Sequence, residues 1–418
     1  MMLIPSLKSK TKHLGIRRLS SPKTLYLPLQ GYNGVMELCV KEGDTVKKYQ
    51  HLAALNGSLA SCIHAPVSGI VEGIVYIQDK PYLQLQNDFK DTEVSRLHRI
   101  PDALSKADII SLMHDYGIIG SGGAKFPTQV KYEGATSKLS YFIINGVECE
   151  PYLSADYALM KEQSEALLSL LALLQKVLQI KRIVFGIEKQ HKELKKLLLT
   201  KAQQLSLDID VKILENTYPQ GGELQLIKAV TGKELPKGSI PVDHDILVNN
   251  VGTLWAMYNA LYNNIPYTER VITVSGEKGK ELGNFNVKIG TPVAHIIEEL
   301  GVEHGFNAIT TILGGPMMGK ALNDTKSPIN KGSGGILFIE NPTNDRYNCI
   351  QCGYCTDVCP QHLMPMEFAR YETQGNSAKL EAFNLNDCIE CGACAYICPS
   401  DVPLMKSIFS GKQLLRTV

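Results

Sequence analysis

Apolar and polar positions change their spacing several times along the chain, and each spacing predicts a different kind of structure. Residues 26–95 contain short β-like runs separated by Gly and Pro, the pattern of a small β-sandwich. Residues 96–262 alternate between strand-like runs, such as Tyr141–Gly146 and Arg182–Ile187, and stretches with helical spacing, such as Glu165–Ile180. Because strands alternate with helices here, we predict a mostly parallel sheet with crossover helices.

Three further regions complete the predicted organisation. Residues 263–330 return to short strands around one helix at Pro292–Leu300, which predicts a small α+β unit. Residues 331–418 carry eight cysteines on short helical stretches. Residues 1–25 form a basic lead-in that we interpret as a solvated tail, with contact to anionic lipid or a partner subunit as the alternative. The chain is therefore predicted to be a multidomain α/β protein.

The sandwich region has the outline of a known carrier domain without its reactive residue. Val40–Leu55 and Ala65–Val75 form the two predicted halves, and their sequence resembles biotinyl and lipoyl carrier domains. Those carriers place a lysine at the hairpin between the halves, whereas Asn56–His64 contains no lysine. We therefore predict a barrel-sandwich domain that does not serve as a carrier.

Composition indicates which class of protein this is, and it says less about what the protein does. The 418 residues are 44% hydrophobic and 20% charged, as in ordinary globular proteins. Lysine and arginine number 43 against 42 for aspartate and glutamate, so charge gives no reason to expect nucleic acid. The most apolar stretch, Ala166–Leu174, is too short to span a bilayer, and the N-terminus does not have the pattern of a secretory signal. We expect a cytoplasmic location, where clustered thiols indicate metal rather than disulfides.

Two copies of one cysteine motif dominate the C-terminal region. Cys349–Pro360 has the spacing C-x2-C-x2-C-x3-C-P, and Cys388–Pro399 repeats it. In proteins with two clusters, the first three cysteines of such a run bind one [4Fe–4S] cluster and the fourth binds the neighbouring cluster. The predicted ligand sets are therefore crossed: Cys349, Cys352, Cys355 and Cys398 for one cluster, and Cys388, Cys391, Cys394 and Cys359 for the other.

A pair of zinc sites is the alternative interpretation of these thiols. Zinc frameworks usually pair two C-x2-C knuckles over a longer gap and need no Cys-Pro closure, so two complete copies of the motif favour clusters. Two neighbouring clusters serve one-electron transfer. The other cysteines, Cys39, Cys62 and Cys149, have no such motif and are predicted to pack as small apolar side chains.

A glycine-rich loop and three later loops predict a ligand pocket in the α/β region. The loop Gly117–Thr128 has Lys125 where a dinucleotide fingerprint has its third glycine, and it follows a helical segment rather than a strand. Its backbone can still approach a phosphate or a flat ring closely. The later loops are Asn145–Pro151, Tyr218–Glu223 and Val248–Thr253, two of them at the ends of predicted strands, where α/β sheets place their ligands.

The motifs GSGGAKFPT, NGVECEP, GGE and VNNVGT occur in the order seen in the flavin-and-NADH subunit of respiratory complex I. The following region resembles an SLBB β-grasp domain and closes with Gly314–Gly319. With the carrier-like domain and both ferredoxin motifs, the chain resembles the RnfC family of Rnf complexes, which are membrane-bound, ion-translocating ferredoxin:NAD+ oxidoreductases. The resemblance implies a Rossmann-like FMN and NADH domain at 96–262, a β-grasp domain at 263–330 and a ferredoxin-like helical domain with two clusters at 331–418.

The resemblance also implies a non-covalent FMN, NAD(H) as substrate and positions for both. The residues expected around FMN are Gly120, Gly122, Gly123, Lys131, Asn145, Asn249 and Asn250. Those expected in the dinucleotide site are Phe126, Glu148, Glu150 and Glu223, while Gly221 and Thr253 belong to the same matched loops. No residue is assigned as catalytic, because hydride transfer to a flavin needs no general acid or base.

Three positions depart from the complex I pattern. Lys125 stands where that subunit has Gly, Val147 replaces an Asp, and Gly222 replaces a second Glu. The resemblance therefore carries no flavin contact to the last two positions, and Lys125 becomes a candidate phosphate contact.

The function implied is that of a peripheral subunit on the cytoplasmic face of the bacterial cell membrane. It would exchange electrons between NAD(H) and ferredoxin, the latter indirectly, alongside other subunits of an Rnf-type complex. A soluble cobalamin reductase of the metabolosome type is one alternative, but its flavin loop lies near the start of the chain, whereas a whole carrier-like domain precedes the loop here. A second alternative is a non-catalytic electron-wiring protein with clusters beside an inert flavin pocket.

Overall fold

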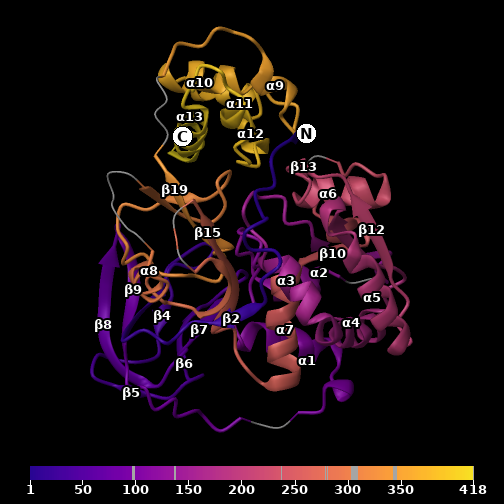
Figure 1. The fold of residues 1–418 in the computed structure, drawn as a ribbon, viewed down its shortest axis with the longest axis vertical. Coiled ribbons are helices and arrows are strands. Elements are labelled where there is room, and N and C mark those ends of the chain that lie inside the picture. Colours follow the sequence, from indigo (N-terminus) through magenta and orange to yellow (C-terminus); the bar gives the residue numbers. More distant parts are fainter. Residues whose placement is uncertain are drawn as a thin grey trace.

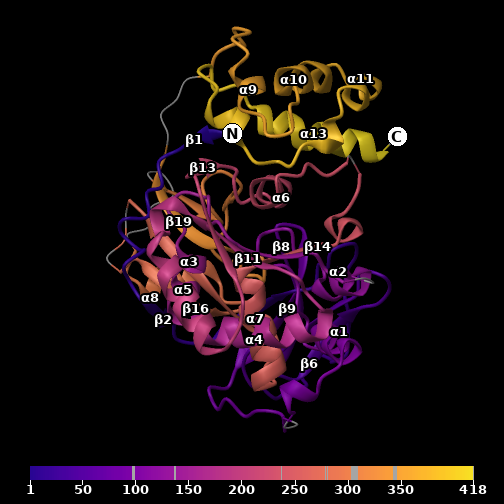
Figure 2. The ribbon, with the colours of Figure 1, turned by 90° about the vertical axis from the view of Figure 1, so that its right-hand side faces the viewer.

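A computed structural model describes residues 1–417 apart from 97–98, 136–137, 237, 278, 280, 303–308 and 342–345. A helical C-terminal domain lies at one end of the molecule, beyond the regions that contain the sheets (Figure 1). The N-terminus lies beside this domain in both views (Figures 1 and 2). No helix among the described residues is long and apolar enough to cross a membrane.

Four parallel strands form the sheet of the α/β region, in the order β12-β11-β10-β14. Their bounds are β10 Tyr141–Gly146, β11 Ile183–Glu188, β12 Asp210–Leu214 and β14 Ile246–Asn250. The surrounding helices are α1 Lys106–Asp115, α2 Thr128–Gly134, α3 Ala155–Glu162, α4 Ser164–Leu178, α5 Glu193–Gln204, α6 Glu223–Thr231 and α7 Val251–Asn263. Fully buried Phe142 and Phe185 lie within the core between this sheet and its helices. The predicted parallel sheet is therefore present, with β10 at the predicted residues.

The sandwich region folds as two small antiparallel sheets around one apolar core. One sheet contains β3 Thr24–Pro28, β5 Thr45–Val46, β8 Gly69–Ile77 and β9 Lys80–Asn87, and the other contains β4 Glu37–Leu38, β6 His51–Leu55 and β7 Ser61–His64. Alternate residues of β8 are buried, as expected for strands with one face on a core.

A six-stranded mixed sheet, with the order β18-β17-β19-β15-β16-β2, forms the third region. Its elements are β2 Ile16–Arg18, β15 Glu269–Gly276, β16 Gly283–Lys288, α8 Val293–Glu299, β17 Ile309–Leu313, β18 Lys320–Ala321 and β19 Gly335–Glu340. Strand β19 lies beyond residue 330, where the sequence suggested a boundary, and it pairs in parallel with β15. Strand β2 comes from the basic lead-in and pairs with β16.

The basic lead-in is built into the fold, in contrast to the solvated tail that the sequence favoured. Strand β1 Met2–Leu3 pairs with β13 Thr217–Tyr218. Lys8 is 1% exposed, and its ammonium group lies 2.9 Å from the Glu188 carboxylate and also donates to the Glu148 carbonyl. A buried lysine needs such partners to offset its desolvation, and a partner 180 residues away cannot be inferred from a run of charges.

The C-terminal domain consists of short helices around a small core. Its helices are α9 Tyr354–Asp357, α10 Pro365–Thr373, α11 Ser377–Ala382, α12 Ala393–Tyr396 and α13 Leu404–Thr417. Phe368, Leu380, Leu385 and Ile408 are fully buried between them. Single turns of 3-10 helix occur at Pro101–Ala103, Lys189–His191, Pro241–His244 and Leu385–Asp387.

Candidate functional site

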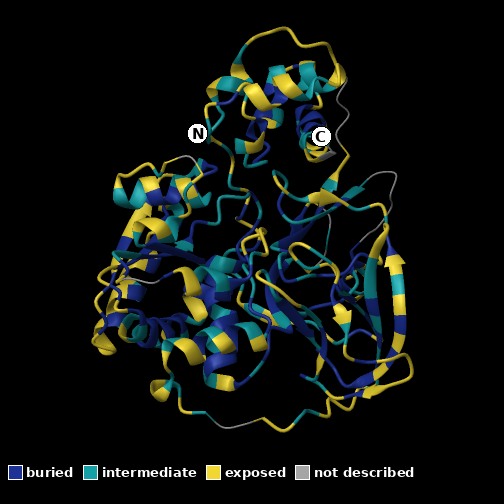
Figure 3. Cartoon of the chain, turned by 180° about the vertical axis from the view of Figure 1, so that it is seen from behind, coloured by how far each residue is buried: buried dark blue, intermediate teal, exposed yellow. Residues whose placement is uncertain are grey.

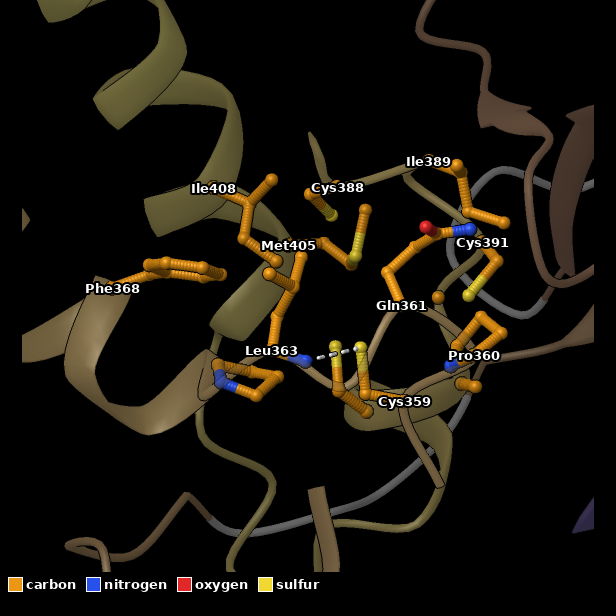
Figure 4. Close-up of a pocket in the computed structure, with 14 residues that line it drawn as sticks. Cys359, Pro360, Gln361, Leu363, Phe368, Cys388, Ile389, Cys391, Met405 and Ile408 are labelled. Atoms are coloured by element: carbon orange, nitrogen blue, oxygen red, sulfur yellow. Dashed lines mark hydrogen bonds between the residues drawn. The ribbon is translucent and has the colours of Figure 1, made fainter. Parts of the chain in front are cut away.

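Two pockets in the C-terminal domain are each lined by four cysteines. The first, here called the inner pocket, is lined by Cys359, Cys388, Cys391 and Cys394, and Figure 4 labels the first three of these. The second, here called the outer pocket, is lined by Cys349, Cys352, Cys355 and Cys398. The fold thus brings together the same two groups of four that the crossed pattern of cysteines predicts.

The two motifs fold in the same way, which explains how the crossing arises. Gly353 and Gly392 both adopt a left-handed conformation, with φ of 82° and 77°, immediately before α9 and α12. Each short helix then contains the third cysteine of its run, and the fourth cysteine follows just past the C-terminal end of the helix. The third cysteine faces the pocket of its own run, whereas the fourth lines the other pocket.

The chemistry of the inner pocket fits a group that carries positive metal charge. Burial raises the pKa of the Cys391 thiol to about 11 and that of Cys394 to about 12. Bound iron would offset this cost, because a coordinating metal deprotonates its thiols. Across the described residues, no three His, Cys, Asp or Glu side chains lie as close as a single metal ion requires, and a four-iron cluster is larger than one ion.

The surroundings of the two pockets differ. Cys391 and Cys394 are buried, whereas Cys349 and Cys352 are exposed, and the whole segment 346–352 before α9 is exposed (Figure 3). The Lys412 ammonium donates to the Cys388 carbonyl at 2.6 Å and pairs with the Glu390 carboxylate at 2.7 Å, which places a cation beside the inner pocket.

The glycine-rich loop lies beside the junction of β14 and α7. The Ser121 N–H donates to the Thr253 hydroxyl at 2.9 Å. A Cβ on Gly122 would lie 3.7 Å from the Asn250 Cβ, so the loop and the end of β14 are in contact. Gly123 has open space around its Cα. The Asn250 amide is oriented at both ends, because it donates to Asp156 at 2.6 Å and accepts from the Gly252 N–H at 2.8 Å.

A second group of predicted residues meets at the end of β10. The Asn145 amide donates to the Gly221 carbonyl at 2.9 Å, which joins the loop after β10 to the loop after β13. The Lys131 ammonium lies 2.7 Å from the Glu223 carboxylate, and both side chains are partly exposed. These four residues come from three different segments of the chain and lie at one edge of the sheet, where they are available to contact a ligand.

Three predicted residues have partners that the sequence did not suggest. The Asn249 amide is buried and donates to the Tyr132 hydroxyl, because adjacent residues in a strand face opposite sides. The expected side-chain bond from Asn249 to flavin therefore does not fit this structure. The Lys125 side chain lies against Gly332, and burial lowers its pKa to about 8. The Phe126 ring packs edge-on against Tyr32 of the sandwich region at 5.3 Å.

The two acids of the loop after β10 are also engaged. The Glu148 carboxylate accepts weakly from the N–H groups of Asp156 and Tyr157, at the start of α3, and burial raises its pKa to about 8. The Glu150 carboxylate accepts from the N–H groups of Met317 and Met318 at 3.0 and 2.8 Å, and burial raises its pKa to about 7. Both carboxylates accept hydrogen bonds from the protein's own backbone, so they do not form an acidic surface that is free to contact a ligand.

Sequence reasoning missed two polar residues of this region. Asp156 orients Asn250 but comes from α3 and belongs to none of the motifs. Ser121 lies inside the glycine-rich motif, and its hydroxyl is within 2.7 Å of the Tyr267 hydroxyl. Of the two, only Ser121 could have been found from the sequence, because it lies within the glycine-rich loop.

Comparison with known families matches three parts of the chain. Residues 2–85 match the RnfC barrel sandwich hybrid domain, residues 113–259 the Nuo51 FMN-binding domain, and residues 348–402 the 4Fe-4S dicluster domain. The predicted barrel-sandwich, FMN-binding and two-cluster units are confirmed by these matches, and FMN and [4Fe–4S] clusters are the cofactors that they support.

Curated relatives match almost the whole chain. The chain is 36% identical over 416 residues to the C subunit of the ion-translocating oxidoreductase complex of Haemophilus influenzae strain 86-028NP, covering 96% of this chain and 62% of that protein. It is 35% identical over 431 residues to the protein of the same name from Edwardsiella ictaluri, covering 99% of this chain and 53% of that one. The chain therefore spans about 50 to 63% of the length of these relatives.

A solved structure shares the fold. A chain of an NAD+-reducing [NiFe]-hydrogenase in the H2-reduced state superposes with a TM-score of 0.56 at 17% identity, covering 76% of this chain and 63% of that chain. At this identity the likeness concerns the fold.

Proposed function

We propose that the chain is a member of the RnfC family, the C subunits of ion-translocating oxidoreductase complexes, and that it exchanges electrons between NAD(H) and ferredoxin. FMN would convert a two-electron hydride into single electrons, which iron–sulfur clusters carry one at a time. The observation that carries this proposal is the position of eight cysteines in two groups of four, in one chain with a domain of the FMN-binding family.

We assign the FMN to the edge of the α/β sheet where the glycine-rich loop meets the ends of β10 and β14. Gly122 and Gly123 leave room for a flat ring or a phosphate, and Asn250 stands beside them with its amide held in place. The Lys131 ammonium is the available cation for a phosphate, since its partner Glu223 is partly exposed and can yield. Asn145 and Gly221 would form the opposite side, joined by their hydrogen bond.

The cluster ligands are proposed to be the four cysteines of each pocket. Thiolate is the form that binds iron, and the eight cysteines are all free thiols here. The amide of Leu363 already donates to the Cys359 sulfur at 3.4 Å (Figure 4). The amide of Glu390 donates to the Cys388 sulfur, also at 3.4 Å. Such N–H groups stabilise negative sulfur and would tune a cluster's potential.

For the third region we propose a β-grasp fold of the SLBB type. The first hairpin, β15–β16, is followed by α8 and then by β17 and β19, and β19 pairs in parallel with β15 at the centre of the sheet. Under this assignment the domain runs past residue 330 to include β19, and the cluster domain follows it.

We place the protein at the cytoplasmic face of the bacterial membrane as a peripheral subunit. The relatives are named for an ion-translocating complex, so membrane attachment would come from other subunits of that complex. Ferredoxin would then be an indirect partner, reached through those subunits.

A second candidate function is electron wiring without reaction with NADH. One observation favours it, because the Glu150 carboxylate, expected to line the dinucleotide site, is engaged by the backbone of Met317 and Met318. The two candidates predict different behaviour of the bound flavin.

The test is made on the purified chain, reconstituted anaerobically with iron, sulfide and FMN. We expect about eight irons per chain, because each cubane holds four, and rapid bleaching of the flavin band by NADH. Flavin that binds but is not reduced by NADH would establish the wiring function instead. Gly122→Trp, which fills the space beside Asn250, is expected to abolish FMN binding while the iron content stays at about eight.

A further inference from the structure

Two buried cations of the mixed-sheet region contact the glycine-rich loop Gly117–Thr128 from its inner side. We propose that these cations, Arg270 and Lys331, are positioning residues that hold carbonyl groups of the loop inward, so that its outer face can bind a phosphate group. This inference rests on the proposed function, because FMN and NAD(H) are the phosphate-containing ligands that this function brings to the loop.

Lys331 joins three regions of the chain at the start of the loop. Its side chain is buried, and its ammonium donates to the Gly117 carbonyl at 2.7 Å and to the Cys62 carbonyl of the sandwich region at 2.9 Å. The turn that contains Lys331 is held by its own hydrogen bonds, since the Ser333 N–H donates to the Asn330 carbonyl at 3.0 Å. Burial lowers the pKa of Lys331 to about 8, so the ammonium stays mostly charged at pH 7.

Arg270 reaches the middle of the loop. Its guanidinium is buried, and two of its nitrogens lie 3.4 and 3.5 Å from the Ser121 carbonyl oxygen. The same guanidinium donates to the Lys331 carbonyl. The Tyr267 hydroxyl donates to the Lys331 carbonyl at 3.1 Å and lies 2.7 Å from the Ser121 hydroxyl. The two cations therefore belong to one hydrogen-bonded unit beneath the loop.

The charge of this unit is not neutralised by a direct ion pair. In the part of the chain that the structure describes, no carboxylate pairs with Arg270 or Lys331, although burying an unpaired cation is costly. Arg270 acts at longer range on the Asp156 carboxyl, whose pKa is raised by burial and lowered in turn by the Asn250 amide and by Arg270. Positive charge beneath the loop favours an anion on the opposite, outer face.

The outer face of the loop has the backbone geometry of an anion site. Gly122, Gly123, Ala124 and Lys125 are exposed. Gly123 and Lys125 have left-handed φ angles of 101° and 55°, and alternation of such residues with ordinary ones turns successive N–H groups to one side. Among the described residues, the Gly122 N–H has no hydrogen-bond acceptor. With their carbonyls held inward, these residues offer N–H groups to a ligand.

The ligand chemistry that fits is a phosphate group, and two molecules of the proposed function contain one. FMN has a phosphate monoester, which riboflavin lacks. NAD(H) has a pyrophosphate, which ADP-ribose keeps without the nicotinamide ring. Comparing FMN with riboflavin, and measuring ADP-ribose separately, therefore shows which phosphate the loop binds.

The test measures binding of these three ligands to the full chain, reconstituted with its clusters and free of flavin. Arg270→Gln keeps a hydrogen-bond donor and removes the charge, whereas Arg270→Lys keeps the charge. Lys288→Gln is the matched control. Lys288 is also a largely buried cation of the mixed sheet, 12% exposed, but its ammonium donates to the Pro66 carbonyl at 2.9 Å and lies 3.6 Å from the Asp91 carboxylate, away from the loop.

We expect the natural chain to bind FMN at least about tenfold more tightly than riboflavin. Arg270→Gln should weaken FMN binding about tenfold and riboflavin binding less than about twofold, with most of the loss recovered in Arg270→Lys. Lys288→Gln should leave all three ligands unchanged. A loss confined to ADP-ribose would support the same positioning role and identify the pyrophosphate as the ligand. Equal losses for FMN and riboflavin with ADP-ribose unchanged, or no loss for any ligand, would overturn the proposal.

A second variant keeps the test available if the Arg270 variants do not fold. Lys331→Met retains the apolar stem and removes the charge, and we expect it to lower the ratio of FMN to riboflavin affinity, or the affinity for ADP-ribose, by about fivefold. An unchanged ratio and unchanged ADP-ribose binding would contradict the role of Lys331. None of these measurements uses oxidation of NADH. Failure of NADH to bleach bound flavin would therefore argue against the proposed function and leave the positioning role intact.

Discussion

The inner and outer pockets are built from one sequence motif and lie in different surroundings. Each is closed by a short helix that follows a left-handed glycine, Gly392 or Gly353. The inner pocket packs on Tyr218 and Met317 and has the Lys412 cation at its edge, whereas the outer pocket presents Cys349 and Cys352 to solvent. The spacing of the motif determines which cysteine sulfurs come together in each pocket. The tertiary contacts around a pocket determine which groups can exchange electrons with it.

The largest expected difference between the pockets comes from their glycines. Gly392→Ala would bring a Cβ to 2.5 Å from the Met317 carbonyl, whereas the same change at Gly353 meets nothing within 4 Å. Both substitutions strain a left-handed backbone, by about 1 kcal/mol, but only the first also causes a collision. We expect Gly392→Ala to destabilise the loaded protein by about 3 kcal/mol and Gly353→Ala by about 1 kcal/mol.

Thermal unfolding of the two reconstituted variants, with iron content measured alongside, checks this difference. The equivalent backbone angles make Gly353→Ala the control for strain alone. Equal losses of stability in both variants would mean that the packing of Gly392 against the Met317 backbone does not stabilise the inner pocket.

The next effect is a pH dependence of stability that comes from the contact between the Glu150 carboxyl group and the backbone of Met317 and Met318. Burial raises the pKa of the Glu150 carboxyl from 4.5 to about 7, so the folded state binds its proton more tightly than the unfolded state. Its contribution to stability is then complete below about pH 4.5 and is lost as the pH rises through 7. Glu150→Gln keeps a carbonyl oxygen as acceptor without the buried charge.

We expect the stability of Glu150→Gln relative to the natural protein to rise between about pH 5 and pH 7.5, by on the order of 2 kcal/mol. Denaturant unfolding of the two proteins over this pH range measures the difference. A constant difference across the range would show that Glu150 does not titrate with folding.

The smallest effect is on the reduction potential of the inner cluster. The Lys412 ammonium, 14% exposed, lies beside Cys388 and Glu390, and a cation next to a cluster favours its reduced, more negative state. Lys412→Gln is expected to lower this potential by some tens of mV, where about 59 mV is a tenfold change for one electron. The outer cluster should not shift.

An EPR-monitored redox titration resolves the two clusters. Lys406→Gln is the control, because Lys406 lies on the same helix and is exposed. Equal shifts in both variants would indicate a general effect of charge rather than the contact at Cys388.

Much of the fold could be predicted from local patterns. The strand at Tyr141–Gly146 and the leucine-rich helix α4 follow from periodicity, and the grouping of the eight cysteines follows from motif spacing. The lead-in could not be predicted, because the burial of Lys8 depends on Glu188, which is distant in the sequence. Strand β19 was not predicted for the same reason, since its partner β15 lies far upstream.

The loops that form the proposed FMN site at the edge of the α/β sheet could be predicted from the sequence. The partners of their individual side chains could not. Gly122 and Asn250 meet as their motifs suggested. Asn249 faces the opposite side of β14, and Glu150 holds a turn of another domain. Both outcomes depend on which face or which neighbour a side chain meets, and single motifs contain no such information.

An anaerobic titration of the reconstituted chain with NADH tests the central claim most directly, with flavin absorbance and cluster EPR recorded together. We predict uptake of about two NADH per chain, because the flavin takes two electrons and each of two clusters takes one. Bleached flavin with about one NADH consumed and no reduced cluster would contradict the electron path, and bound flavin that NADH leaves oxidised would contradict the proposed function itself.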